Sequence, residues 1–169
     1  MNATTSRRPR ALLLDDDPTV LRLLGTALEA RGFEVRAAVD ARSGIDALTD
    51  ELLDLDVLVA DAELPGRDAA SLVHLVRHAG GERDLGIVVL AGAPSPDLRS
   101  RLLALGADAV VDRAVGHDAA AEVVRGLADR RAAAAPTWLD GPVPAAVRGA
   151  LVAARDAFGL PRGLAGVPA

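Results

Sequence analysis

The stretch "RALLLDDDPTVLRLL", residues 10–24, contains the features that decide the fold. Its first part, residues 10–14, has the continuous apolarity of a strand buried on both faces. Three aspartates, residues 15–17, follow at once. Apolar residues then recur at helical spacing from Leu21 to Leu28. A buried strand that ends in acids and leads directly into an amphipathic helix is typical of α/β proteins.

The same strand-then-helix unit recurs along the chain. Strands are predicted at residues 10–14, 33–37, 57–60, 86–91 and 109–111. Helices are predicted before Gly32, at 41–50, between Asp68 and Gly80, between Ser95 and Gly106, and at 117–131. Strict alternation of short strands with longer helices predicts a doubly wound α/β fold with a parallel central sheet.

Composition excludes several classes of protein. The chain has 169 residues, half of them apolar, which is enough for a core. It contains no cysteine, so neither disulfides nor a thiolate metal site are expected. Its net charge of −5 argues against broad nucleic-acid binding. No apolar run approaches the ~18 residues of a membrane span, and the first ten residues do not form a secretory signal. We therefore expect a cytoplasmic protein that binds neither membrane nor nucleic acid.

Acidic residues gather at the predicted strand ends. In parallel sheets, ligands bind beyond the carboxyl ends of the strands. Residues 15–17 follow the first strand and Asp61 ends the third, while Ala91 ends the fourth and Asp112-Arg113 the fifth. The acids are thus expected to lie close together at one edge of the sheet.

Two explanations of the acidic cluster compete. Asp before Pro at a helix start is a good N-cap, which accounts for one acid of 15–17 but leaves Asp61 unexplained. At ~4 Å and an effective dielectric near 20, each pair of carboxylates repels by roughly 4 kcal/mol. A hard divalent cation removes that repulsion, and a ligand set made only of oxygen favours Mg²⁺. The residues favour a magnesium site over capping alone.

One family that places acids at a strand end is the haloacid dehalogenase-like phosphatases. Their opening motif, D-x-D-x-T, is similar to Asp15, Asp17 and Thr19 of this chain. The resemblance would make Asp15 a nucleophile and Asp17 an acid/base. It also requires a Ser or Thr at a later strand end and a downstream Lys, but the fourth strand ends in Ala91 and the chain has no Lys. A small phosphatase is the least favoured hypothesis.

A second family matches over much more of the chain. Residues 10 to 130 resemble the receiver domain of two-component response regulators. The resemblance rests on four segments in the family's order and spacing: "LLLDDDPTVLRLL", "LDVLVADAELPGRDAASL", "GIVVLAGA" and "LGADAVVDRAV". It implies a flavodoxin-like receiver fold with strand order 2-1-3-4-5.

The resemblance also implies a site and a partner. Asp61 would accept a phosphoryl group from a histidine kinase or phosphotransfer protein. Asp15 and Asp16 would be the acidic pair that, with Asp61 and the backbone carbonyl of Glu63, holds Mg²⁺. Asp17 is left to cap the first helix. Such a protein signals by protein–protein contact with a downstream partner and is not an enzyme in the usual sense, although it can catalyse its own phosphorylation and dephosphorylation.

The chain departs from the family pattern at four positions. Ala91 stands where receivers have Thr or Ser, and Arg113 stands where they have Lys. Val110 replaces the aromatic switch residue, and Ala114 replaces a Pro whose peptide bond is cis. These departures keep an alternative open: a degenerate receiver that acts as an interaction or dimerisation scaffold without phosphorylation.

The segments outside the receiver-like region have simpler expectations. Residues 10–131 form the receiver-like domain, and the remainder offers one helix where a helix-turn-helix output module needs three, so no DNA-binding output is expected. A homodimer is an open alternative. The other predicted segments are a flexible N-terminal tail at 1–9, a linker at 132–144, an amphipathic helix at 145–159 and a flexible tail at 160–169.

Overall fold

The sheet has the order β2-β1-β3-β4-β5, and every neighbouring pair of strands is parallel. The computed structural model describes residues 7–51, 54–65, 68–79 and 85–134. Its strands are β1 (Arg10–Leu14), β2 (Glu34–Ala38), β3 (Val57–Asp61), β4 (Gly86–Ala91) and β5 (Ala109–Asp112). The predicted fold class and strand order are confirmed.

The helices follow the strands in the predicted alternation. They are α1 (Pro18–Glu29), α2 (Ala41–Glu51), α3 (Ala69–Ala79), α4 (Pro96–Ala104) and α5 (His117–Ala134), with a short 3-10 turn η1 (Arg113–Val115) before α5. The helix α5 extends beyond the predicted end at residue 131. The helix expected at 145–159 and the tail at 160–169 lie outside the described residues. None of the described helices combines the length and apolarity needed to cross a membrane.

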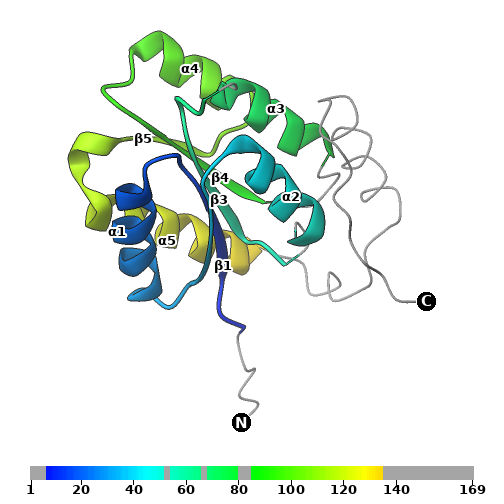
Figure 1. Cartoon of the computed structure of the whole chain (residues 1–169), viewed down its shortest axis with the longest axis vertical. Helices are drawn as coiled ribbons and strands as arrows, with labels where there is room; N and C mark the ends of the chain where they lie inside the picture. Colours follow the sequence, from blue (N-terminus) through cyan, green and yellow to red (C-terminus); the bar gives the residue numbers. More distant parts are fainter. Residues whose placement is uncertain (1–6, 52–53, 66–67, 80–84, 135–169) are drawn as a thin grey trace.

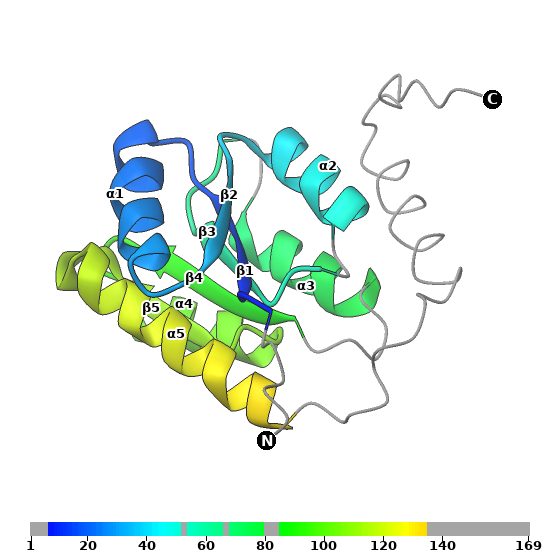
Figure 2. The same ribbon diagram turned by 90° about the horizontal axis from the view of Figure 1, so that it is seen from below.

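The helices cover the two faces of the sheet in two groups. Figure 1 and Figure 2 show α1 and α5 on one face and α2, α3 and α4 on the other. Alternate residues of each central strand enter one of two apolar clusters, so Leu12 and Leu58 pack with the second group, and Leu13 and Val59 pack with the first. Burial on both faces explains why these strands are continuously apolar.

Side chains at the helix starts behave as predicted. The Asp17 carboxylate accepts a hydrogen bond of 2.7 Å from the Thr19 backbone N–H at the start of α1. The Ser95 hydroxyl accepts one of 3.1 Å from the Leu98 N–H at the start of α4. Each satisfies a helix N–H group that has no partner within its own helix. These caps fix where the chain leaves the sheet edge and turns back along it.

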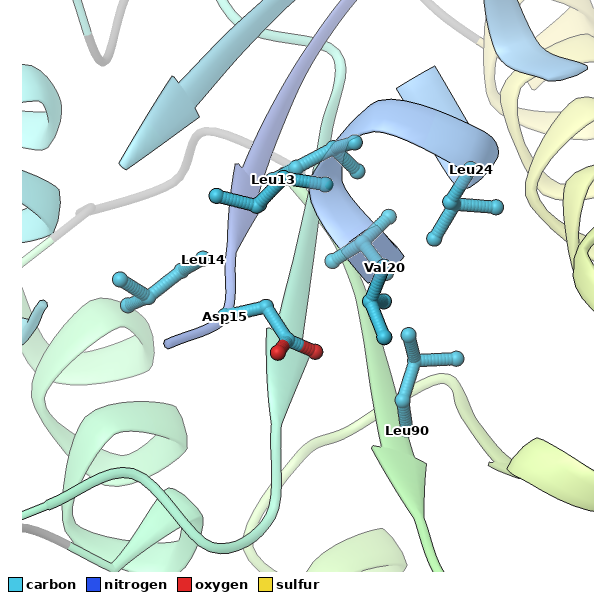
Figure 3. A pocket seen from close by; sticks show the side chains of 8 residues that line it. Leu13, Leu14, Asp15, Val20, Leu24 and Leu90 are labelled. Atoms are coloured by element: carbon cyan, nitrogen blue, oxygen red, sulfur yellow. The ribbon is translucent and has the colours of Figure 1, made fainter. Parts of the chain in front are cut away.

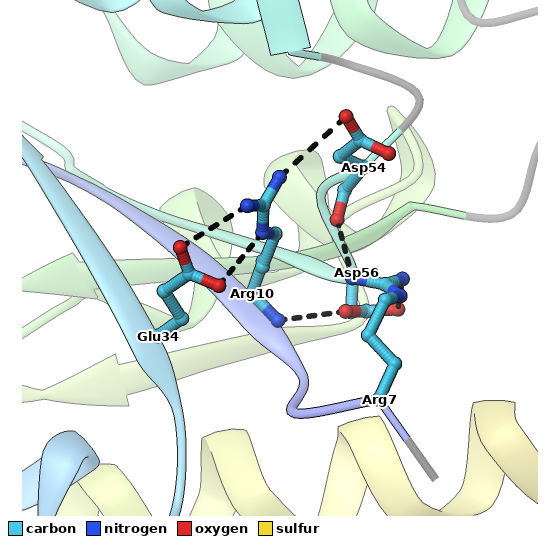
Figure 4. Close-up of polar contacts among 5 residues, drawn as sticks. All are labelled: Arg7, Arg10, Glu34, Asp54 and Asp56. Atoms are coloured by element: carbon cyan, nitrogen blue, oxygen red, sulfur yellow. Dashed lines mark hydrogen bonds and ion pairs between the residues drawn. The ribbon is translucent and has the colours of Figure 1, made fainter. Parts of the chain in front are cut away.

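Charged side chains fix the opposite, amino end of the sheet (Figure 4). Arg10 bonds Glu34 through Nε at 2.9 Å, and its backbone N–H donates to Asp56 at 2.7 Å. Arg7, within the segment expected to be a tail, donates to the Asp54 carbonyl and the Asp56 carboxylate. Because these contacts join β1 to β2 and to the start of β3, they support the register in which the carboxyl ends of the strands align.

A close approach between α2 and β1 makes one glycine hard to replace. A Cβ on Gly44 would lie 2.8 Å from Cδ2 and 2.9 Å from Cδ1 of Leu14, which is buried at the end of β1. We expect Gly44→Ala to lower the free energy of unfolding by about 1–2 kcal/mol in urea denaturation, since overpacking outweighs the gain in helix propensity. Gly126→Ala in α5, where the nearest atom is the Arg130 Nη1 at 3.4 Å, should instead be neutral or stabilising. A Gly44→Ala protein as stable as Gly126→Ala would contradict this.

Candidate functional site

Three carboxylates meet at the carboxyl ends of β1 and β3. Asp15 and Asp16 follow β1, and Asp61 is the last residue of β3. Each contributes an oxygen that lies within 4.8 Å of those of the other two. Asp15 is 2% exposed and Asp61 5%, whereas Asp16 is open to solvent. The sequence prediction that the acids at the strand ends lie close together is confirmed for Asp15, Asp16 and Asp61.

Hydrogen bonds after the end of β1 direct the side chains of Asp15 and Asp17 to different places. The Asp15 N–H donates to the Ala38 carbonyl at 3.1 Å, which extends the pairing of β1 with β2 by one residue. Asp15 Oδ1 then accepts the Asp17 N–H at 2.9 Å. The Asp17 carboxylate points to the start of α1, where it accepts the Thr19 N–H. Helix capping therefore accounts for Asp17 but not for the other acids of the cluster. The Asp15–Asp17 pair that a phosphatase would need is not assembled.

Asp61 is held by the turn that follows β3. The Ala62 N–H donates to the Leu90 carbonyl at 2.7 Å, which continues the β3–β4 pairing. The Glu63 N–H donates to Asp61 Oδ1 at 3.2 Å. The Glu63 side chain is exposed, and the participation of its carbonyl in metal binding stays a prediction.

A single guanidinium nitrogen bridges the two buried carboxylates. Arg113 Nη2 lies 2.8 Å from Asp15 Oδ2 and 2.7 Å from Asp61 Oδ1. Arg113 begins η1, and the Asp112 carboxylate caps that turn by accepting the Ala114 N–H at 2.8 Å. The position of a cation beside the acids could be expected from the sequence, but its contact with both carboxylates could not.

Ionisation of Asp15 costs free energy in the folded protein. Burial raises the pKa of Asp15, and the charges of Asp61 and Asp16 add to that effect, while the Asp17 amide and Arg113 oppose it. Figure 3 shows its carboxylate beside apolar side chains, among them Val20 and Leu90. The site is thus electrostatically strained in favour of a cation.

The chemistry of the donor set fits Mg²⁺. All three side chains offer hard oxygen ligands, and Mg²⁺ characteristically takes one or two carboxylates and keeps several waters. The exposed Asp16 leaves one side of the cluster accessible to solvent, where such waters would lie.

This electrostatic strain predicts a dependence of stability on pH. Because the folded-state pKa of Asp15 is raised, the ionised group destabilises the native state at neutral pH, and protonation relieves that cost as the pH falls through the folded-state pKa. We expect Asp15→Asn in a metal-free buffer to raise the melting temperature by a few degrees near neutral pH. The difference from the unmodified chain should shrink toward about pH 4. A variant that is less stable than the unmodified chain at neutral pH would contradict this.

Ala91 in β4 and Val110 in β5, two positions at which the chain departs from the receiver pattern, are both buried and apolar. Ala91, 2% exposed, ends β4 and pairs in register with Asp112. It has no hydroxyl to offer, and a Cβ on the following Gly92 would meet no atom within 4 Å. Val110 is buried in the cluster under α3 and α4. All peptide bonds among the described residues are trans, including the one before Ala114.

A model of the response regulator receiver domain family matches residues 11–125. The chain belongs to this family. The receiver is 33% identical over 123 residues to the sensor protein GacS of Pseudomonas syringae pv. syringae, a match that covers 71% of this chain and 13% of GacS. It is 36% identical over 100 residues to the transcriptional regulatory protein PrrA of Mycobacterium tuberculosis, covering 59% of this chain and 41% of PrrA.

Solved structures of receiver domains have the same fold as this chain. A CheY-like response regulator receiver domain protein from Methanospirillum hungatei superposes with a TM-score of 0.68 at 22% identity, covering 76% of this chain and 100% of that chain. At this identity the match shows the fold alone. The receiver spans less than half the length of the curated relatives named above.

Proposed function

We propose that this receiver accepts a phosphoryl group on Asp61 from a histidine kinase or a phosphotransfer protein. The observation that supports this most is the meeting of the buried Asp15 and Asp61 with the exposed Asp16 within 4.8 Å. Mg²⁺ held by Asp15, Asp16, Asp61 and the Glu63 carbonyl would neutralise charge on the phosphoryl oxygens during transfer.

In the proposed reaction, a carboxylate oxygen of Asp61 attacks phosphorus while the phosphorus–nitrogen bond of the donor phosphohistidine breaks. Arg113 and the Glu63 N–H both contact Oδ1 of Asp61, which orients the carboxylate and leaves Oδ2 as the attacking oxygen. The Arg113 guanidinium lies where it can bond a phosphoryl oxygen after transfer. A planar guanidinium suits such oxygens, although it does not reproduce the compact ammonium of Lys.

Ala91 weakens the response that we expect to phosphorylation. Without a hydroxyl at this position, a hydrogen bond to a charged phosphoryl oxygen worth about 1.5–3 kcal/mol is absent. A ligand shifts a conformational equilibrium only through contacts that differ between the two states. Val110 and Ala91 therefore favour, as the second candidate, a receiver that acts as an interaction or dimerisation scaffold without phosphate.

The output that we propose is protein–protein contact. GacS is a sensor protein and PrrA a transcriptional regulatory protein, so receivers similar to this one occur within larger signalling proteins. We propose a phosphodonor on the input side and a downstream protein partner on the output side. A second copy of the chain is the alternative partner.

The test is covalent labelling. The full chain is incubated with Mg²⁺ and acetyl phosphate, and its intact mass is measured before and after hydroxylamine treatment, which cleaves acyl phosphates. A hydroxylamine-sensitive phosphate supports the phosphoacceptor function. A chain that takes no phosphate, yet still binds a partner or itself, would support the scaffold. Continuous release of phosphate that depends on Asp15 would revive the phosphatase hypothesis.

A further inference from the structure

The acids at the carboxyl end of the sheet already have a cation within the protein. Arg113 Nη2 contacts Asp15 Oδ2 and Asp61 Oδ1 at 2.8 and 2.7 Å, and 30% of the Arg113 side chain is exposed. In the described part of the chain, no other basic side chain lies within ion-pair distance of Asp15 or Asp61. One unit of positive charge therefore partly balances two buried negative charges.

Backbone groups engage further oxygens of the same two carboxylates. The Asp17 N–H donates to Asp15 Oδ1, and the Glu63 N–H donates to the Asp61 Oδ1 that Arg113 also contacts. Both oxygens of Asp15 and one of Asp61 thus have protein donors. A divalent ion that binds among the three acids must therefore lie close to the like charge of Arg113, and it must compete with protein donors wherever it uses an oxygen of Asp15 or Oδ1 of Asp61.

We propose that Arg113 is a resident counter-ion that competes with the divalent cation for this site. It stabilises the acidic cluster in the absence of metal, and it lowers the affinity for Mg²⁺ because the ion must either bind beside a like charge or displace Arg113 from a carboxylate. Arg113 therefore sets the concentration of Mg²⁺ that the receiver needs to fill its metal site. The proposal extends the proposed function through the magnesium site, but it concerns metal binding alone and requires no phosphoryl transfer.

We attribute the lowered Mg²⁺ affinity to the charge of Arg113 and not to the length of its side chain alone. Arg113→Met removes the charge and keeps a long unbranched side chain. Arg113→Lys keeps the charge as a compact ammonium. Arg130→Met makes the same chemical change at an exposed position near the end of α5, so it controls for net charge.

The experiment measures Mg²⁺ binding to the metal-free full chain by calorimetric titration, together with the melting temperature with and without Mg²⁺. We expect Arg113→Met to bind Mg²⁺ roughly tenfold more tightly than the unmodified chain, because removing a nearby like charge is worth at least that factor. Without metal it should melt at a lower temperature, and Mg²⁺ should recover most of the difference. Arg113→Lys should stay close to the unmodified chain in affinity, and Arg130→Met should match it in both measurements.

Each other outcome overturns the proposal. Equal or weaker Mg²⁺ binding by Arg113→Met would make Arg113 a structural residue only, and equal tightening in Arg130→Met would make the effect one of net charge. If Arg113→Met does not fold without metal, the affinity of Arg113→Lys decides, and binding about tenfold tighter than the unmodified chain overturns the proposal. The titrations contain no phosphodonor, so their result does not depend on phosphoryl transfer. A chain that shows the expected ranking of Mg²⁺ affinities but never takes phosphate would support this inference and contradict the proposed function.

Discussion

Replacing Asp61 by asparagine should abolish covalent phosphorylation and leave the fold intact. The amide is not a nucleophile, so no acyl phosphate can form at this position. Asn is close to Asp in size, and its carbonyl oxygen can still accept the Glu63 N–H and an N–H of Arg113, which now contact Oδ1. The buried site keeps these hydrogen bonds and loses one of its repelling charges. Intact mass after incubation with acetyl phosphate and Mg²⁺ measures the loss, and thermal melting confirms the fold.

Asp17→Asn is the matched control. It makes the same chemical change in the acidic stretch that follows β1, but its side chain caps α1 through the Thr19 N–H and does not face Asp61. Asn is as good an N-cap as Asp, so stability should be almost unchanged. Labelling of this control should equal that of the unmodified chain. Persistent labelling of Asp61→Asn would place the phosphoacceptor elsewhere in the chain.

The fold could be predicted because each element carries a local signal. The bounds of β1 and β4 agree with the prediction, since both are continuous apolar runs enclosed by polar or small residues. Asp17 and Ser95 marked helix starts by their capping chemistry. The bounds of β2 shifted by one residue, from 33–37 to 34–38. Phe33 packs in the core beside α1 and is as apolar as a strand residue, so the sequence offered no boundary there.

The site could be predicted in its residues but not in its contacts. The parallel topology places Asp15, Asp16 and Asp61 at one edge, and that follows from the order of strands. The bridge that Arg113 forms between Asp15 and Asp61 depends on the turn η1, which no sequence pattern indicated. Side-chain direction within a few ångströms is set by packing, and a one-letter pattern does not encode it.

A further ion-pair cluster, around Asp108 at the amino end of the sheet, could not be predicted from the sequence for the same reason. Asp108 Oδ2 lies 2.7 Å from Arg77 Nη2 and accepts the Ile87 N–H at 2.7 Å, while its Oδ1 lies 2.6 Å from Arg131 Nη2. The residues come from α3, β4, α5 and the loop before β5. Their separation along the chain, 31 residues between Arg77 and Asp108, hides the association.

Asp108→Ala should therefore lower the free energy of unfolding by about 2–3 kcal/mol, because it removes the carboxylate that pairs with two partly buried guanidinium groups and accepts one backbone N–H. The side chains of Asp108 and Arg77 are 22% and 23% exposed, so solvent compensates only part of the loss. Arg77 keeps its bonds to the Gly106 and Leu85 carbonyls, which limits the damage to the loops around β4 and β5. Urea denaturation measures the change.

The comparison that makes this test decisive is Asp129→Ala, which breaks an exposed i,i+4 pair with Arg125 on α5. Such surface pairs contribute about 0.3–0.5 kcal/mol, so the two substitutions should differ several-fold in cost. Asp108→Asn keeps an acceptor for the Ile87 N–H and should fall between them, which separates the hydrogen bond from the charge. If Asp108→Ala costs no more than Asp129→Ala, solvent compensates the guanidinium groups and the Asp108 cluster contributes little to stability. Because the cluster lies at the end of the strands opposite Asp61, a destabilised Asp108→Ala chain that remains folded should still take phosphate on Asp61.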